Sequence, residues 1–441
     1  MSVDLSPAVA ASDVLATLPD GLMPGPGQIA PPAPLDYAER TLPNGLRVLA
    51  ARLASAPVVE LRLSVPFGGE EPEHCATAEL LTATLLAGTT RRGRDVFEHE
   101  LAGLGGSLRA TVRPERLQVT GRLLAYGLGA MLDLLADCLT AAAYAPDAVA
   151  RERARLLDRV RLAERLPQYA ARAALLEHCF GGHPAARETP SVEQVAAVPA
   201  DALPALHRDA LVPGGSVLVL VGDLVPEQAL DAAATALAGW TGARPARVLP
   251  RPPAIAGGPL VHLDRPAAQQ ADVRIAVPSR PRSDPGFPAL HLAELVLGGY
   301  FSSRLVRVLR EELGYVYSVQ CTSEDIAGRA LNIVQFGCDP RHTRDALDRV
   351  LAELDRIGGD APPSAAEVES ARGYACGMQA IALSAQAGLA EGLLGACVTG
   401  RPPGWLTEFP GRIAATGADR VRAAAAGAMP AAGATGVVLE P

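Results

Sequence analysis

A repeated β–α pattern is the feature that most constrains how this chain can fold. Residues 273–278 (VRIAVP) match residues 61–66 (LRLSVP), and both runs end at Val-Pro. Each is followed by an acidic loop and an apolar helix, predicted over 76–87 and 286–298. Each half later has a hairpin-like β segment and a long helix with an acidic start, the second opening on the capping box Ser364-x-x-Glu367. One duplicated α+β unit accounts for this pattern more simply than two unrelated domains.

Local signals predict the elements of the first half. Asn44-Gly45 between two apolar runs indicates a β-hairpin. A left-handed helix cap is expected at Gly105-Gly106, and proline suits the first turn of the helix that starts at Pro226. The sequence therefore predicts strands at 40–42, 46–51, 58–66, 107–112, 117–124 and 216–221, and helices at 76–87, 96–104, most of 127–209, and 226–240.

Shifts in composition suggest the domain boundaries. Residues 1–35 are rich in Pro and Gly near their end and are expected to form a loose extension or strap. Residues 36–240 form the first predicted lobe and residues 260–441 the second. Between them, residues 241–259 (TGARPARVLPRPPAIAGGP) have no periodicity and indicate a linker that joins two rigid lobes.

Composition excludes several classes of protein. A chain of 441 residues with 49% hydrophobic content is long enough for two or more cores. The net charge of −8 does not favour binding to nucleic acid or to an anionic membrane surface. No apolar run approaches transmembrane length, and the N-terminus lacks the basic region of a signal peptide. We therefore expect neither nucleic acid nor a membrane among the partners.

Cysteine and lysine usage point to the compartment and the source. The seven cysteines are scattered, odd in number and never in C-x-x-C spacing, so they are expected to be free thiols of a reducing cytoplasm. All 40 basic residues are arginine and none is lysine, which with the Ala, Gly and Pro bias indicates a GC-rich genome. A cytoplasmic bacterial protein is the expectation.

Residues 297–319 (LGGYFSSRLVRVLREELGYVYSV) carry the strongest chemical signal. A glycine pair, Gly298-Gly299, leads into a short amphipathic helix, which Gly314 ends before a β-prone run at 315–319. Arg310 and Tyr317 would then project from neighbouring elements, a guanidinium and a phenol able to converge on one acceptor oxygen. The alternative is that Arg310 is a solvated surface residue, as most helical arginines are.

This stretch resembles the second-half signature of the pitrilysin/insulinase family of zinc peptidases, in its mitochondrial-processing-peptidase-like branch. The agreement covers Ser302-Ser303-Arg304-Leu305, Arg310-Glu311, Gly314 and Tyr317-Ser318 at fixed spacing, and the resemblance extends over residues 38–441. It implies an α+β fold of two homologous α/β-sandwich lobes, each with a mixed, largely antiparallel sheet, that form half of a clam shell. It also implies that Arg310 and Tyr317 reach the substrate near the scissile carbonyl.

The zinc motif of that family is missing. Family members carry H-x-x-E-H on the first long helix, with two zinc ligands one turn apart and a general-base glutamate. The resembling block is residues 76–90 (ATAELLTATLLAGTT), and its Gly88-Thr89 pair places the motif positions at Glu79, Thr82 and Ala83. The third ligand should fall near Arg159, where only Asp158 offers a carboxylate. The chain therefore resembles a non-catalytic family member that binds no metal itself.

The other candidate residues are weaker. His178 and His183 flank Gly181-Gly182 with no standard zinc spacing, and His74 and His99 lie alone near the lost motif, so none is expected to bind metal. Gly298 and Gly299, with Ser302, are candidates for substrate binding, since the pair resembles a much shortened form of the family's glycine-rich loop. Arg304 is expected to tie its helix to a neighbouring carboxylate, whereas Glu311 and Glu312 are expected to be solvated or paired.

The resemblance implies a heterodimer with a homologous chain that carries an intact H-x-x-E-H motif and the zinc. This chain would not be active alone, but would supply Arg310 and Tyr317 to the partner's site. The substrate would be an unfolded peptide bound as an added strand, with leader peptides of natural products or cofactor precursors among the possibilities. A structural scaffold role, as in the core subunits of respiratory complex III, and a peptide-binding role without a partner are the alternatives. A peptidase with a different metal site is a further one, for which no ligands are found.

Overall fold

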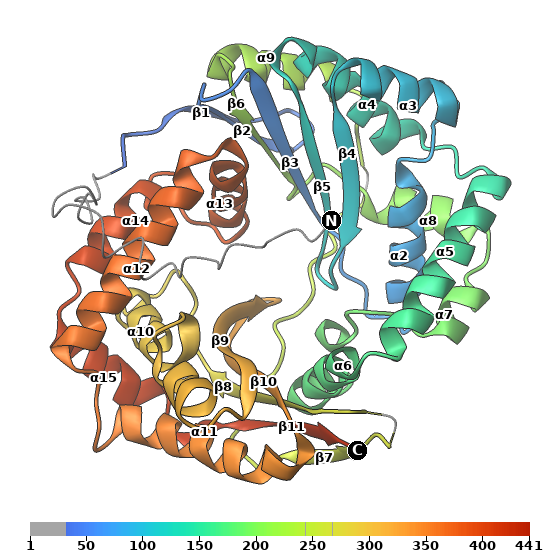
Figure 1. The fold of residues 1–441 in the computed structure, drawn as a ribbon. Helices are drawn as coiled ribbons and strands as arrows, with labels where there is room; N and C mark the ends of the chain where they lie inside the picture. Colours follow the sequence, from blue (N-terminus) through green and yellow to red (C-terminus); the bar gives the residue numbers. More distant parts are fainter. Residues whose placement is uncertain (1–31, 243, 267) are drawn as a thin grey trace, which may run out of the picture. The chain divides into compact units, whose positions relative to one another are not determined.

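The computed structural model describes residues 32–242, 244–266 and 268–441. Two β-sheets with helices packed on them make up this part of the chain (Figure 1). The extension predicted over residues 1–35 falls outside the described residues as far as residue 31.

The first sheet has six strands in the order β1-β2-β6-β3-β5-β4. Only β2 and β6 run parallel, and all other neighbours are antiparallel. The predicted hairpin joins β1 to β2, where Gly45 has φ of +90° and the Leu42 amide donates to the Leu46 carbonyl at 2.8 Å. The strands are β1 (Asp36–Thr41), β2 (Arg47–Arg52), β3 (Val58–Pro66), β4 (Ser107–Val112), β5 (Arg116–Leu124) and β6 (Val217–Gly222).

The second sheet repeats the plan of the first. Its five strands follow the order β7-β11-β8-β10-β9, again with one parallel pair, β7 and β11. The strands β2-β6-β3-β5-β4 of the first sheet match the five strands β7-β11-β8-β10-β9 of the second. The run LRLSVP lies in β3 and the run VRIAVP lies in β8, so each run lies in the middle strand of its five. The strands are β7 (Val261–Asp264), β8 (Ala271–Pro278), β9 (Val316–Ile326), β10 (Arg329–Cys338) and β11 (Thr435–Glu440). The predicted α+β fold with two homologous lobes is confirmed.

Helices cover both sheets, and several follow the predicted boundaries closely. Those of the first half are α2 (His74–Leu85), α3 (Arg94–Gly103), α4 (Leu128–Ala141), α5 (Pro146–Glu164), α6 (Pro167–Phe180), α7 (Val192–Ala197), α8 (Ala202–Ala210) and α9 (Pro226–Ala236). Those of the second half are α10 (Phe287–Glu294), α11 (Thr343–Gly358), α12 (Ala365–Ser384), α13 (Gln386–Val398), α14 (Trp405–Ala414) and α15 (Ala418–Ala428).

Each half contributes one helix to the sheet of the other half. The strand β6 (VLVLVG) is apolar and buried on both faces, so each face of the first sheet needs a cover there. Helix α13 packs on β3 and β6, and its apolar side chains share a core with Leu49, Val219 and Val221. Helix α6 packs on β8 and β11, where Leu175 and Phe180 share a core with Val437 and other residues of the second sheet. The predicted lobes, residues 36–240 and 260–441, do not take this exchange of helices into account. Their limits stay a prediction.

Two helices around the predicted active residues differ from ordinary α-helices. The helix predicted over 286–298 is α-helical to Glu294 and continues as a π-helical turn, Leu295–Gly299. The helix that carries Arg310 is a π-helix, Val306–Glu312, and π turns are frequent at functional sites. Among the described helices, none is by itself long and apolar enough to cross a membrane, although the bent pair α12 and α13 passes that test by length and composition.

Candidate functional site

Arg310 and Tyr317 lie side by side on the surface of the second lobe. The π-helix carries Arg310, Gly314 reverses the chain with φ of +67°, and β9 then presents Tyr317. The Tyr317 side chain is 89% exposed, and the Arg310 guanidinium carbon lies 5.7 Å from the centre of its ring. Within the described part of the chain, no carboxylate lies within 4 Å of the Arg310 guanidinium. Two strong donors are therefore held together and left open to a ligand.

A residue that the sequence reasoning missed helps to hold Arg310. Phe301 is 66% exposed, and the centre of its ring lies 5.0 Å from the Arg310 guanidinium carbon. The guanidinium thus has an aromatic ring on two sides, and cation–π attraction of about 0.5–1 kcal/mol at an exposed site favours this orientation over free rotation. No sequence pattern indicates this contact, because the separation of Phe301 and Arg310 follows no fixed spacing.

The glycine pair borders the same site. Gly298, Gly299, Phe301 and Arg310 line one pocket of about 390 Å³. A Cβ atom on Gly298 would come within 2.9 Å of the Cys321 Cβ on β9, so the glycine permits close packing of the π-helical turn on the sheet. Ser302 is exposed and does not belong to the lining of this pocket.

Arg304 binds a carboxylate of a neighbouring helix, Glu367 of α12, as predicted. Its Nε and Nη2 atoms donate to the two carboxylate oxygens of Glu367 at 2.7 and 2.8 Å, and its Nη1 donates to the Ala361 carbonyl at 2.6 Å. Glu367 also closes the predicted capping box with Ser364 at the start of α12. The hydrogen bond from Arg304 lowers the pKa of Glu367 to about 2, so the pair is charged at neutral pH.

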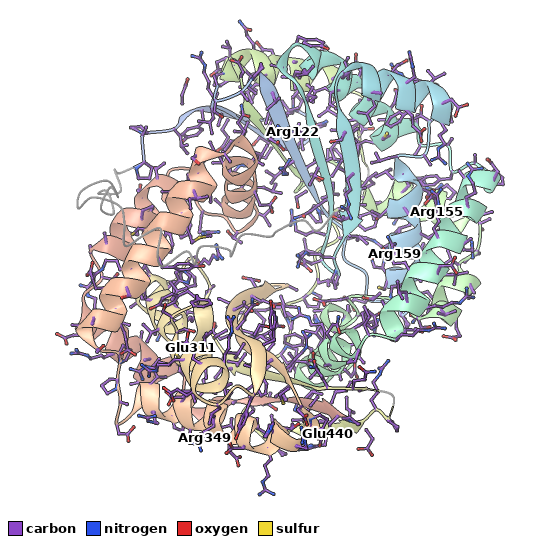
Figure 2. The ribbon with its side chains drawn as sticks, in the orientation of Figure 1. Arg122, Arg155, Arg159, Glu311, Arg349 and Glu440 are labelled. Carbon is purple, nitrogen blue, oxygen red and sulfur yellow. The ribbon has the colours of Figure 1, made fainter. Side chains whose placement is uncertain are left out.

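The positions of the lost zinc motif meet in the first lobe. Glu79, Thr82 and Ala83 on α2 line a pocket of about 350 Å³ together with Arg159. Figure 2 shows Arg159 on α5. The Arg159 Nη2 atom lies 3.4 Å from the Glu79 Oε2 atom. Asp158 does not line this pocket but pairs with Arg161 at 3.1 Å. The structure thus sets Arg159, and not Asp158, opposite the motif positions.

These residues do not fit a zinc ion. The Thr82 hydroxyl donates to the Ala78 carbonyl of its own helix at 2.6 Å, Ala83 has no ligand atom, and Arg159 brings a positive charge. Burial raises the pKa of Glu79, whereas Arg159 opposes that rise. Of the residues that the structure describes, no three His, Cys, Asp or Glu side chains form a metal-binding group. At the three predicted motif positions the structure thus places a carboxylate beside a guanidinium.

The edge strand of the first sheet borders this pocket. Residues 109–112 of β4 line it, and among the described strands β4 has no neighbour on its outer side. A free strand edge beside a hollow can accept an extended peptide through backbone hydrogen bonds.

The histidines have other roles. His178 Nε2 lies 2.6 Å from the Thr435 hydroxyl, and His183 Nδ1 accepts from the Ala185 amide at 3.1 Å. His74 Nε2 lies 2.8 Å from the Phe67 carbonyl, and burial lowers the pKa of its ring. His99 lies exposed on α3.

Fold and site together define a class: a two-lobed α+β protein with an exposed Arg–Tyr pair in the second lobe and a pocket lined by Glu79 and Arg159 in the first. Two family descriptions match the chain, Insulinase (Peptidase family M16) at residues 47–191 and Peptidase M16 inactive domain at residues 197–373. The chain belongs to this insulinase, or pitrilysin, family, which confirms the resemblance.

Curated relatives and solved structures agree with this family. An uncharacterized zinc protease of Mycobacterium leprae is 27% identical over 73% of this chain and 73% of its own length. One of Streptomyces coelicolor is 26% identical over 72% of this chain and 71% of its own length. A peptidase M16 inactive domain of Pseudomonas fluorescens superimposes with a TM-score of 0.85 at 21% identity, covering 92% of this chain and 98% of that one.

Two further solved structures share the fold. A protease of Helicobacter pylori has a TM-score of 0.81 at 15% identity, covering 92% of this chain and 100% of that chain. A chain of Complex III2 from Candida albicans has a TM-score of 0.74 at 18% identity, covering 91% and 94%. At these identities the likeness concerns the fold alone.

Proposed function

We propose that this chain is the non-catalytic subunit of a heterodimeric zinc metalloendopeptidase, and that it supplies Arg310 and Tyr317 to the active site of its partner. The partner is a homologous chain with an intact H-x-x-E-H motif, which holds the zinc and the general base. The observation that carries this proposal is the exposed Arg310–Tyr317 pair, which has no carboxylate partner within the described residues. Packing within the chain does not require a tyrosine that is 89% exposed.

The chemistry of the pair suits a carbonyl oxygen on which negative charge develops. A guanidinium and a phenol can both donate to one oxygen, and donors fixed before the reaction stabilise the transition state by a few kcal/mol. The rings of Phe301 and Tyr317 restrain the guanidinium from both sides, so less side-chain freedom is lost when substrate binds. The zinc of the partner would polarise the same carbonyl and lower the pKa of the attacking water.

The substrate class follows from the site. An unfolded peptide in extended form fits a pair of donors beside a strand, and folded proteins are expected to be poor substrates. Leader peptides of natural products and precursors of cofactors are examples of such chains. All seven cysteines are free thiols, which supports a reducing cytoplasm as the compartment.

A direct test is reconstitution. Zinc content and peptidase activity are measured for this chain alone, for an H-x-x-E-H homologue from the same source alone, and for their mixture. We expect activity only in the mixture, with about one zinc per heterodimer. Zinc-dependent activity of this chain alone would overturn the proposal.

A scaffold role is the second candidate, because the fold is also that of a chain in Complex III2 of Candida albicans. A scaffold role does not account for an exposed guanidinium and phenol held side by side. If the pair can be replaced with no change in the activity of the mixture, the scaffold role is the better explanation.

A further inference from the structure

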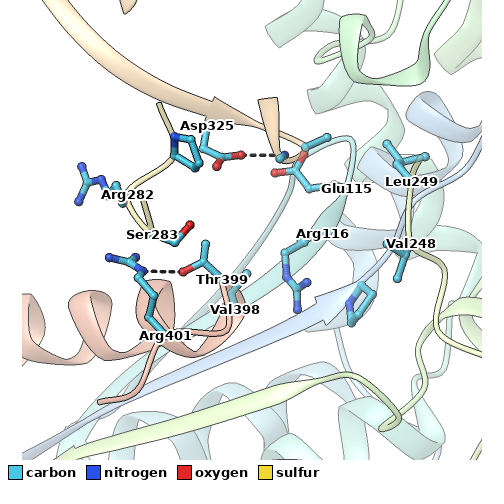
Figure 3. A pocket seen from close by; sticks show the side chains of 14 residues that line it. Glu115, Arg116, Val248, Leu249, Arg282, Ser283, Asp325, Val398, Thr399 and Arg401 are labelled. Carbon is cyan, nitrogen blue, oxygen red and sulfur yellow. Dashed lines mark hydrogen bonds between the residues drawn. The ribbon is translucent and has the colours of Figure 1, made fainter. Parts of the chain in front are cut away.

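A pocket apart from the Arg310 site gathers arginines from both halves of the chain. It lies where the ends of β3 and β5, the linker, the loop after β8, the β9–β10 turn and the segment after α13 come together (Figure 3). Its volume is about 410 Å³, within the range of pockets that hold small organic ligands. Arg116, Arg282 and Arg401 line it.

Arg401 is the most informative of the three, because it is only 8% exposed. Its guanidinium stacks on Trp405 at 3.9 Å, its Nε donates to the Thr399 hydroxyl at 2.9 Å, and its Nη2 donates to the Gly395 carbonyl at 3.4 Å. Its Nη1 is buried and has no hydrogen-bond partner in the described part of the chain. Burial, with a smaller effect from Arg282, lowers the pKa of Arg401 to about 10, against an opposing effect of Asp325.

A buried donor without an acceptor is unfavourable by about 1–3 kcal/mol, and more for a charged group. Such donors are normally matched by a protein group, an ordered water or an ion. The Nη1 atom itself is closed to solvent, but Arg401 lines the pocket with no carboxylate within 4 Å among the described residues, and an anion in the pocket would balance its charge.

The two other arginines also lack carboxylate partners. Among the described residues, no carboxylate oxygen lies within 4 Å of Arg116, Arg282 or Arg401. The Nε of Arg116 donates to the Ser64 hydroxyl at 2.6 Å, and the Arg282 guanidinium carbon lies 5.9 Å from the centre of the Phe287 ring. Figure 3 shows Arg282 and Arg401 on one side of the pocket and Arg116 on the other.

The charge of the ligand follows from the acidic residues in the same lining. Glu115 and Asp325 face this pocket, and Asp325 accepts from the Gly328 amide at 2.7 Å. Three guanidinium groups and two carboxylates leave one net positive charge. A singly charged anion balances it, whereas a doubly charged phosphate would leave an excess of negative charge. Guanidinium groups bind carboxylates through paired hydrogen bonds, and Val248, Leu249 and Val398 offer apolar contact beside them.

The pocket is also connected to the altered zinc site. It shares Glu115 and Asp325 with a hollow at the β4–β5 turn, and that hollow shares Val112 and Thr189 with the pocket around Glu79 and Arg159. A row of hollows thus runs from the free edge of β4 to the three arginines. An extended peptide that lies along this row would bring one end to the arginines.

We infer that Arg116, Arg282 and Arg401 bind the C-terminal carboxylate of a peptide. That the ligand is a peptide is inferred from the proposed function. That it binds through a carboxylate is inferred from the arginines that line the pocket. Binding here requires neither Arg310 nor Tyr317, so this chain would hold peptide ends away from the place of cleavage.

The test is calorimetric titration of the full chain, without a partner, with an N-acetylated peptide of six apolar residues. The peptide is used in two forms, with a free C-terminal carboxylate and with a C-terminal amide. We expect the free acid to bind at least tenfold more tightly than the amide. Arg401→Gln and Arg282→Gln should each remove most of this difference, and acetate should compete with the acid form.

Controls separate binding from folding. Arg349→Gln replaces an exposed arginine outside the pocket that pairs with Asp345, and it should leave the difference between acid and amide unchanged. Arg282 is exposed, so its variant keeps the test valid even if Arg401→Gln unfolds the chain.

Three outcomes would overturn the inference: equal affinity for the acid and the amide, saturable binding of neither, or inorganic phosphate binding more tightly than the acid. None of these outcomes bears on the role of Arg310 and Tyr317. That role is tested separately, by measuring the turnover of peptide by the mixed subunits.

Discussion

The Nη2 atom of Arg159 on α5 lies 3.4 Å from the Oε2 atom of Glu79 on α2, beside a pocket that both residues line. Glu79 is one of the three positions that we predict to correspond to the zinc motif of the family. The guanidinium neutralises the one carboxylate among these three positions and links α2 to α5 without a metal ion.

Restoring the metal site should require four substitutions and not three. The variant E79H/T82E/A83H/R159E is expected to bind about one zinc per chain, because a structural or catalytic site needs a third ligand in place of a cation. The variant E79H/T82E/A83H, which keeps Arg159, should bind zinc at least 100-fold more weakly. Competition with a chromophoric chelator measures both affinities. Equal affinities would show that Arg159 does not stand at the third ligand position.

The Arg310–Tyr317 pair should act on turnover and not on assembly. In the reconstituted heterodimer, Arg310→Gln is expected to lower kcat by about 100-fold, because one donor to the transition state is lost. Tyr317→Phe should lower kcat in the same direction. Arg307→Gln is the matched control, since Arg307 lies on the same helix and pairs with Glu312 on the surface. Gel filtration checks that each variant still assembles, and unchanged kcat in both active-pair variants would exclude the role in trans.

Stability should depend on the pH through Glu79. Burial raises its pKa in the folded chain above the unfolded value, so the folded state favours the protonated form. Its contribution is present below the unfolded pKa and is lost as the pH rises through the folded pKa. Glu79→Gln should therefore flatten the fall in stability that sets in as the pH rises above the unfolded pKa of about 4.3. Urea unfolding at several pH values measures this, and an unchanged pH profile would contradict the prediction.

The Arg304–Glu367 pair should have the opposite pH dependence. The pKa of Glu367 is lowered to about 2, so its contribution is present above the unfolded pKa of about 4.3 and is lost as the pH falls towards 2. Arg304→Ala should destabilise the chain by about 2 kcal/mol or more, since it removes charged hydrogen bonds. Arg412→Ala, which breaks an exposed pair with Glu408, should change stability by about 0.5 kcal/mol or less. Similar losses in the two variants would speak against this account.

The docking of α13 on the first sheet should depend on Gln386. Its Nε2 atom lies 2.7, 2.9 and 3.2 Å from the carbonyls of Leu53, Ala56 and Val58. Gln386→Ala should destabilise the chain by about 1–3 kcal/mol, because the bonds that tie α13 to the loop before β3 are lost and the Leu53 carbonyl loses its side-chain donor. Gln386→Glu should be worse, since a carboxylate cannot donate to a carbonyl. Thermal unfolding measures the order, and a Gln386→Glu variant as stable as the native chain would refute it.

Several features of the site were predictable because they depend on short stretches of sequence. The bidentate contact of Arg304 with a carboxylate, the capping box of Ser364 and Glu367, and the strand that runs from Val58 to Pro66 all follow from local patterns. The positions of Arg310 and Tyr317 on either side of Gly314 do as well. The aromatic partner Phe301 was missed because a stacking contact between a loop and a helix has no fixed spacing.

The sequence by itself determined the family, the two-lobed repeat and the loss of the zinc motif, because each of these depends on which residues occur at fixed separations along the chain. Only the tertiary structure decided that Arg159 and not Asp158 faces Glu79, since a helix face is set by packing and not by order in the chain. The same holds for the exchange of α6 and α13 between the sheets and for the meeting of Arg116, Arg282 and Arg401. Those three residues are far apart in sequence, and the folding of both halves around one pocket brings them together.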